Sequence, residues 1–69
     1  MSAEIIFLVE PSEDGGYTAM ALGHAIFTQG DSEAEVERNV KEAVRCHFEP
    51  EERPKVVRLH YVRDVVISL

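Results

Sequence analysis

Hydrophobic residues follow one another without interruption near the start of the chain. This apolar run, in which β-branched and aromatic side chains predominate, consists of Ile5, Ile6, Phe7, Leu8 and Val9. A run of this length and composition predicts a strand, here over residues 4–10, with both faces apolar. The turn-forming segment 11–16 follows, and its Asp-Gly step readily supplies the positive φ of a tight hairpin. A second strand is therefore predicted over residues 17–22.

Residues 25–28 form the next apolar segment, between Gly23 and Gly30. Glycine limits the segment on both sides, because it interrupts regular strands. The uneven pattern of these residues fits a short third strand, which would complete a meander. It fits an irregular loop equally well.

A helix is predicted from Ser32 onward. Residues 32–35 match a capping box, in which the Ser32 hydroxyl accepts from the Glu35 amide and the Glu35 side chain accepts from the Ser32 amide. Pro50 disfavours helical geometry at Glu49, which gives a helix of about 16 residues. Residues at helical spacing form one stripe that should face the sheet. This stripe contains Val36, Val40, Ala43, Val44, His47 and, at its edge, Phe48.

Strand alternation returns after a proline-containing loop and continues through residues 56–69. One face of this segment carries Val57, Leu59, Tyr61, Val65, Ile67 and Leu69. Arg63 alone interrupts that series. A straight strand of this length would span roughly 45 Å, well beyond the usual length of a strand. We therefore expect either a bend near Arg63 and Asp64 or a tail that leaves its own domain.

The predicted order of elements is β-β-β-α-β, and we expect residues 1–69 to form one domain of the α+β class. In this fold one helix packs on one face of a small mixed sheet and connects two parallel strands through a right-handed crossover. The other face of the sheet is left for a partner. We expect a homo-oligomer, a dimer or a tetramer, formed by packing of sheets or by exchange of the C-terminal strand. The expected interface residues are Ile5, Phe7, Val65 and Ile67.

Charge narrows the range of partners. Thirteen acidic residues against seven basic ones give a net charge of −6, which repels a nucleic-acid backbone and favours a basic protein surface. The same charge also fits a plain role in solubility. We expect this chain alone to bind no nucleic acid. No apolar run approaches the roughly 18 residues of a membrane span, and the first residues lack the basic start of a signal peptide, so we expect a cytoplasmic protein without membrane contact.

The residues that most often carry catalysis or bind metals show no matching pattern. Three histidines and the single cysteine do not have the spacing of zinc ligands: His24, His47, His60 and Cys46. Four carboxylates could in principle hold a divalent metal, but no feature of the sequence distinguishes them: Glu4, Glu10, Glu35 and Asp64. We therefore expect a binding protein that is not an enzyme and has no metal or cofactor. A small metal-dependent enzyme built on these groups is the less favoured alternative.

Three segments, taken in order, resemble the HicB family of antitoxins. They are the acidic-Gly-Gly-Tyr hairpin within residues 13–19, the Gly-Asp-Ser helix entry within residues 28–35, and the following helix with Asn39. The resemblance covers nearly the whole chain. It implies a partial ribonuclease-H-like fold without nuclease activity, since such domains lack the catalytic carboxylate set. It also implies that the chain binds and neutralises a HicA-type toxin, a small basic protein that cleaves messenger RNA.

An antitoxin of this kind would meet its toxin through acidic and aromatic side chains. We expect these in the hairpin and at the start of the helix: Glu13, Asp14, Tyr17, Glu33 and Glu37. The chain differs from many HicB proteins in two ways. It ends at Leu69 where they continue into a DNA-binding domain, so autorepression is not expected, and residues 23–26 replace the usual Pro-Gly-like segment. An orphan domain with a structural or oligomeric role and no toxin is the alternative.

Overall fold

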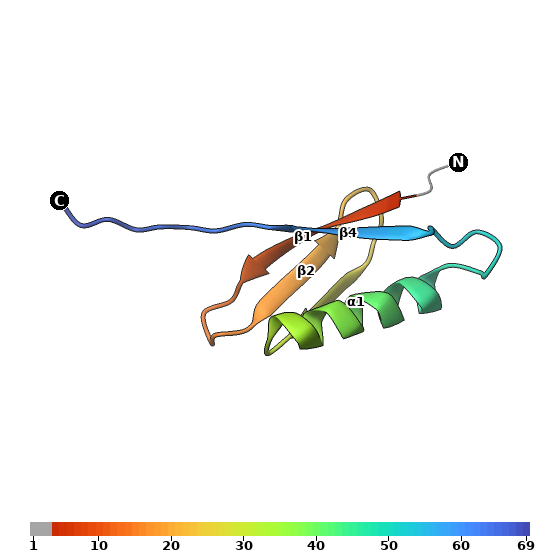
Figure 1. The fold of residues 1–69 in the computed structure, drawn as a ribbon, viewed down its shortest axis with the longest axis horizontal. Coiled ribbons are helices and arrows are strands. Elements are labelled where there is room, and N and C mark those ends of the chain that lie inside the picture. The colour runs from red at the N-terminus through yellow and green to blue at the C-terminus, as the bar shows by residue number, and fades with distance from the viewer. Residues whose placement is uncertain (1–3) are drawn as a thin grey trace.

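The computed structural model describes residues 4–69 and contains four strands and one helix (Figure 1). The α+β class and the order β-β-β-α-β predicted from the sequence are confirmed. The elements are β1 (Glu4–Pro11), β2 (Tyr17–Ala21), β3 (Phe27–Gly30), α1 (Glu33–His47) and β4 (Val56–Tyr61). Over the described residues, no helix is long and apolar enough to cross a membrane.

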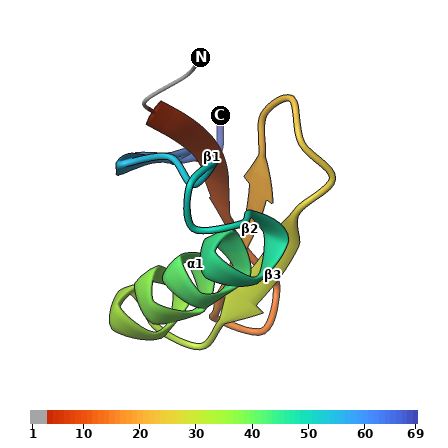
Figure 2. The ribbon, with the colours of Figure 1, turned by 90° about the vertical axis from the view of Figure 1, so that its right-hand side faces the viewer.

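The four strands form one mixed sheet in the order β3-β2-β1-β4. β1 pairs antiparallel with β2 and parallel with β4, so that Phe7 lies between Ala21 and Leu59. The parallel pair requires a crossover, which α1 provides. Figure 2 shows α1 lying across one face of the sheet. β3 and β4 are the two edges.

The core lies between α1 and the sheet. Alternate residues of β1 point into it, because successive side chains of a strand face opposite sides. These residues are Ile5, Phe7 and Val9, and they are packed among Ala19, Ala21, Ile26, Val36, Val40 and Val44, all of them buried. The expected place of Ile5 and Phe7 at an oligomer interface is therefore wrong, since their exposed fractions are 2% and 0%. The apolar residues of β1 that face away from α1 are Ile6 and Leu8.

The start of α1 follows the predicted cap only in part. The Ser32 hydroxyl accepts from the Glu35 amide at 3.1 Å, as expected. The Glu35 carboxylate, however, accepts from the amide of Asp31 at 3.3 Å and not from that of Ser32. The first bond satisfies a backbone amide that the first turn of a helix leaves without a partner, and the second ties Glu35 to the residue before the cap. At the other end, His47 is exposed, so the predicted sheet-facing stripe ends at Val44, with Ala43 and Phe48 packed at its sides.

Two strands, β3 and β4, differ from the prediction by more than one residue at a boundary. The third strand exists but begins two residues later, at Phe27, because Ile26 turns into the core from the preceding loop. β4 ends at Tyr61, which pairs with Val9, two residues before β1 ends at Pro11 and turns back into β2. After the Val62 amide donates to the Val9 carbonyl at 2.8 Å, residues 62–69 extend away from the domain (Figure 1). We call this segment the C-terminal tail, and it fits the predicted tail better than the predicted bend.

Close packing fixes the position of α1 over β3. A Cβ atom on Gly30 would lie 2.6 Å from the backbone nitrogen of Val36, and one on Gly16 would lie 2.6 Å from the Gly30 carbonyl oxygen. The Asn39 side-chain amide also donates to the Gln29 carbonyl at 2.6 Å. The edge of β3 is thus in direct contact with the first two turns of α1.

The variant Gly30→Ala is expected to lower the free energy of unfolding by about 1–3 kcal/mol, the usual cost of overpacking a core. Its methyl group would meet helix backbone, which cannot move without separating α1 from the sheet. Urea denaturation measures the change. Gln29→Ala, at an exposed neighbouring position, is the control, and equal stability of the two variants would contradict the packing argument.

Candidate protein-binding surfaces

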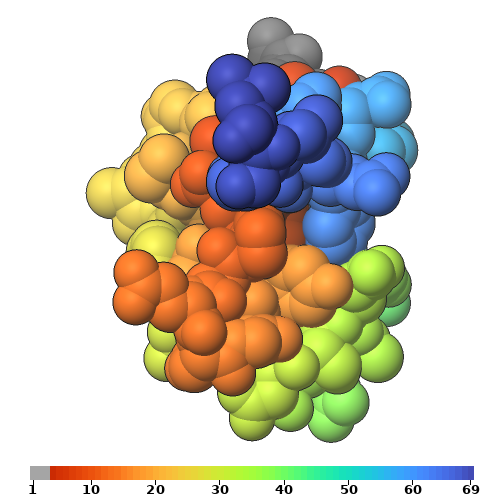
Figure 3. Space-filling view, turned by 90° about the vertical axis from the view of Figure 1, so that its left-hand side faces the viewer, coloured from red at the N-terminus to blue at the C-terminus, as the bar shows by residue number. Residues whose placement is uncertain are grey.

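The β1–β2 turn and the start of α1 lie at the same end of the molecule, as Figures 1 and 3 show. We call this region the acidic end. Between the two segments is an open hollow of about 240 Å³, lined by Ser12, Asp14, Tyr17, Gln29, Gly30, Asp31 and Glu35. Two of the five residues predicted to bind a partner, Asp14 and Tyr17, lie in its wall.

The β1–β2 turn holds Asp14 in place. The Ser12 amide donates to the Gly16 carbonyl at 2.8 Å, and Gly15 adopts a φ of 93°, which glycine tolerates without strain. The Asp14 carboxylate accepts from the Ser12 hydroxyl and from the Gly16 amide. These hydrogen bonds, that of Ser12 first, lower the pKa of Asp14. The carboxylate is therefore ionised and fixed at the rim of the hollow.

A lowered pKa in the folded state predicts how stability depends on pH. Ionised Asp14 stabilises the fold above its ordinary pKa of 3.8, and this contribution is lost as the pH falls through the lower folded value. Asp14→Ala should therefore be less stable than the unmodified chain at pH 6, and the difference should shrink as the pH falls below 3.8. Thermal unfolding across this range measures it. Glu13→Ala removes the adjacent exposed carboxylate, and an identical pH profile for both variants would refute the role of Asp14.

The other side of the helix start carries a second cluster, around Tyr61. The ring of Tyr61 lies edge-to-face on that of Tyr17, with centroids 6.0 Å apart. Burial raises the pKa of Tyr61, and the charges of Glu33 and Glu37 raise it further. The structure thus brings all five predicted residues to the acidic end: Glu13 and Asp14 in the β1–β2 turn, Tyr17 at the start of β2, and Glu33 and Glu37 in the first turns of α1. Sequence reasoning had placed Tyr61 on a strand face without assigning it to a binding surface.

The Tyr61 phenol reports the negative potential at this end. The chain has two tyrosines, so Tyr17→Phe leaves Tyr61 as the one phenol that titrates. In that background Glu37→Gln should lower the pKa of Tyr61, because it removes a negative charge that disfavours the phenolate. Ultraviolet absorbance follows the titration. Glu51→Gln, in the loop after α1, should leave the pKa unchanged, and an equal shift in both variants would show that Glu37 has no local effect.

The sheet face opposite α1 is apolar and uncovered, and we call it the open face. Leu8 is paired with Met20, and Met20 is paired with Phe27, so these side chains form a row across three strands. Ile6 lies on the same face of β1, with Leu22 beside it just past β2. Met20, Leu22 and Phe27 are about half exposed or more. A contiguous apolar patch of this kind is typical of a protein contact surface.

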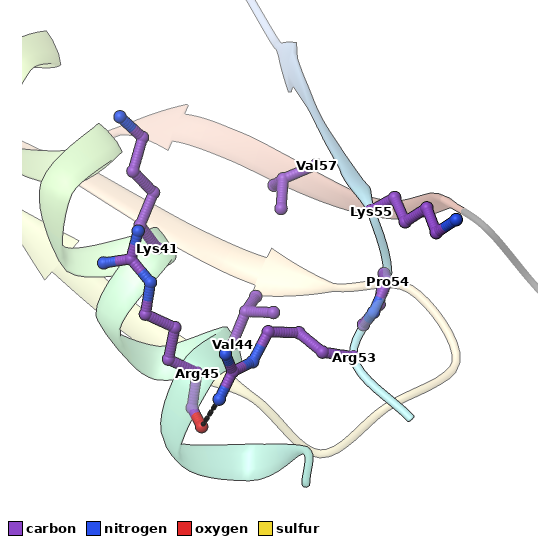
Figure 4. A pocket seen from close by; sticks show the side chains of 7 residues that line it. All are labelled: Lys41, Val44, Arg45, Arg53, Pro54, Lys55 and Val57. Carbon is purple, nitrogen blue, oxygen red and sulfur yellow. Dashed lines mark hydrogen bonds between the residues drawn. The ribbon is translucent and has the colours of Figure 1, made fainter. Parts of the chain in front are cut away.

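A groove separates α1 from β4, because α1 packs mainly on β3 and β2. Two hollows make up the groove. One, of about 370 Å³, is lined by Lys41, Val44, Arg45, Arg53, Pro54, Lys55 and Val57 (Figure 4). The other, of about 100 Å³, is lined by Glu37, Val40, Lys41, Val57 and Leu59. The hollows share Lys41 and Val57, so we treat them as one α1–β4 groove with an apolar floor.

The rim of this groove is basic, a feature that the sequence reasoning missed. Four of the chain's seven lysines and arginines line it. Arg53 donates to the Arg45 carbonyl at 3.1 Å, at the last turn of α1. The ion pair within residues 4–69 is that of Arg58 with Glu4 at 2.8 Å, so the rim cations have no carboxylate partner among these residues. The spacing of Lys41 and Arg45 by one helical turn was the available sequence signal.

The histidines and Cys46 do not assemble into a reactive centre in the part of the chain that the structure describes. The His47 ring lies against Phe48, with centroids 4.8 Å apart, and His24 packs on the same Phe48 at 5.2 Å. His60 is across the sheet, paired with Leu8. Cys46 is exposed. Within residues 4–69 no three histidine, cysteine or acidic side chains come together as metal ligands would.

Fold and surfaces together define a small α+β domain with an acidic end, an apolar open face and a groove with a basic rim. Two curated relatives carry the same family name. The chain is 62% identical over 52 residues to a UPF0150 protein of Archaeoglobus fulgidus, covering 75% of this chain and 77% of the relative. It is 46% identical over 66 residues to a UPF0150 protein of Thermotoga maritima, covering 96% and 93%. The chain belongs to the UPF0150 family. No family model and no solved structure matches it.

Proposed function

We propose that this chain is a protein-binding module of the HicB antitoxin type, which binds and neutralises a small basic HicA-type toxin that cleaves messenger RNA. The observation that carries the proposal is the acidic end. There the β1–β2 turn and the helix entry, the two segments most similar to HicB, lie on either side of one hollow. Segments separated along the chain thus contribute to one surface.

The charge of this surface suits a basic partner. Asp14, Asp31 and Glu35 line the hollow, and none of them has a lysine or arginine partner among the described residues. Unpaired carboxylates gathered on one surface accelerate association with a basic protein and disfavour acidic ones. A toxin that binds RNA needs a basic surface, and a bound acidic module would cover it.

Tyr17 adds an apolar and hydrogen-bonding anchor to the charged surface. It is half-buried beside Tyr61 and lines the hollow. Tyrosine is among the residues that most often dominate the binding energy at protein interfaces, because it buries a large rigid surface at little entropic cost. The acidic end therefore combines the steering charge and the aromatic anchor that a specific complex requires.

Co-expression and co-purification with any small basic protein encoded beside this chain test the proposal. Calorimetry should show a stoichiometric complex whose affinity falls as salt is raised. The variant Glu13→Lys, in the turn next to the hollow, should weaken binding by about tenfold or more, within the range of charge reversal at an interface.

Glu51→Lys is the matched control, because it changes net charge by the same amount in the loop after α1, away from the acidic end. It should bind nearly as well as the unmodified chain. Equal loss of binding in the two variants would show that only net charge matters. Failure of any small basic neighbour to bind would refute the antitoxin role.

A further inference from the structure

The C-terminal tail has apolar side chains that nothing in its own chain covers. The exposed fractions of Val65, Val66 and Ile67 are 67%, 93% and 78%. Beyond the bond from Val62 to Val9 the tail has almost no β1 left to pair with, because β1 continues for two residues only, to Pro11, which has no amide N–H to donate, and then turns back into β2. An extended segment of β-branched residues without a ladder partner is a template for pairing with another chain.

The strand that could receive such a segment is β4. It is an edge of the sheet, with β1 on one side only. The Val62 amide points toward β1, where it donates to Val9. In a regular strand the amides of alternate residues point the opposite way, so those of Tyr61, Leu59 and Val57 face the free edge. Beside this edge lies the α1–β4 groove, whose floor includes Leu59 and Val57.

We propose that the tail of one copy pairs antiparallel with the free edge of β4 in a second copy, beside the α1–β4 groove of that copy. The tail of the second copy pairs in the same way with β4 of the first. Each sheet then gains a fifth strand. A two-fold arrangement is favoured because the unpaired tail and the unpaired β4 edge follow one another in a single segment, residues 56–69. The exchange pairs the tail and the β4 edge of both copies, so the assembly stops at two copies. This inference does not depend on the toxin-binding function.

Charge selects the register of the paired strands. In a two-fold antiparallel pair of strands, one residue lies on the symmetry axis, opposite the same residue of the other chain. A centre at Arg63 or Asp64 would bring like charges face to face, which is unfavourable. A centre at Val62 avoids this and keeps the outward amides of odd-numbered residues paired with one another. It places Val65 opposite Leu59 and Ile67 opposite Val57, so apolar side chains meet on the groove side.

The same register accounts for the two charged residues of the tail. Arg63 of one copy would lie opposite Tyr61 of the other, whose phenol is within electrostatic reach of Glu33 and Glu37. An arginine at that point meets an aromatic ring and two carboxylates. Asp64 would lie opposite His60 on the other side of the sheet. Arg63, the single break in the apolar series of this strand, thus falls where a cation is favourable.

Sedimentation equilibrium of the full chain and two variants tests the exchange. Ile67→Gln removes an apolar side chain from the groove side, and Val66→Gln makes the same kind of change on the opposite side of the tail. The unmodified chain should form a dimer. Ile67→Gln should raise the dimer dissociation constant by about tenfold or more, because the contact occurs twice, whereas Val66→Gln should change it by less than about threefold.

Isotope-filtered nuclear Overhauser spectra of a dimer mixed from labelled and unlabelled chains identify the interface directly. Contacts between Ile67 and Val57 methyl groups of different copies, and between Val65 and Leu59, would establish the register. Intermolecular contacts from Leu8 and Met20 in their place would overturn the proposal in favour of packing between open faces. A monomer at millimolar concentration, or equal effects of the two glutamine variants, would also overturn it.

Discussion

The packing of α1 on the sheet is the interaction on which the other features of this domain depend. Val36, Val40 and Val44 bury against alternate residues of β1 and β2 and make up much of the core. A domain of this size has little apolar area to spare, and it has a single helix among its described residues. That helix can cover one face of the sheet, which decides that Ile6 and Leu8 remain on the open face.

The displacement of α1 toward the β3 edge of the sheet follows from its contacts with β3. Gly30 allows the first turns of the helix to approach the strand backbone closely, and Asn39 bonds the carbonyl of Gln29. A helix held over β3 and β2 does not extend equally over β4. The α1–β4 groove is therefore a consequence of where the helix begins. The direction of the helix also separates the charges, since acidic residues occupy its first turn and basic residues its last, an order that the helix dipole favours.

The strands and the helix could be predicted because they rest on local signals. The apolar run of β1, the Asp-Gly turn and the Ser32 cap each specify an element within a few residues. The buried face of β1 could not be predicted in this way, because Ile5 and Ile6 are equally apolar and only the docked helix distinguishes them. The acidic end could be predicted in part, because it is formed by the two segments whose sequences resemble HicB. The basic groove escaped prediction because it depends on the offset of α1 and on the return of residues 53–57 beside it.

The two sides of the helix start have separate uses in this scheme. The hollow with Asp14 and Glu35 lies between the turn and the β3 side of α1, whereas Tyr61, Glu33 and Glu37 cluster on the β4 side. In the proposed dimer Arg63 of the second copy occupies the β4 side. Its positive charge offsets part of the repulsion between two acidic ends brought close to one axis. The hollow on the β3 side stays outside this contact, so the dimer would present two equivalent acidic surfaces. A basic partner could then bind each copy independently, and an additional contact between two bound partners would be needed before their binding became cooperative.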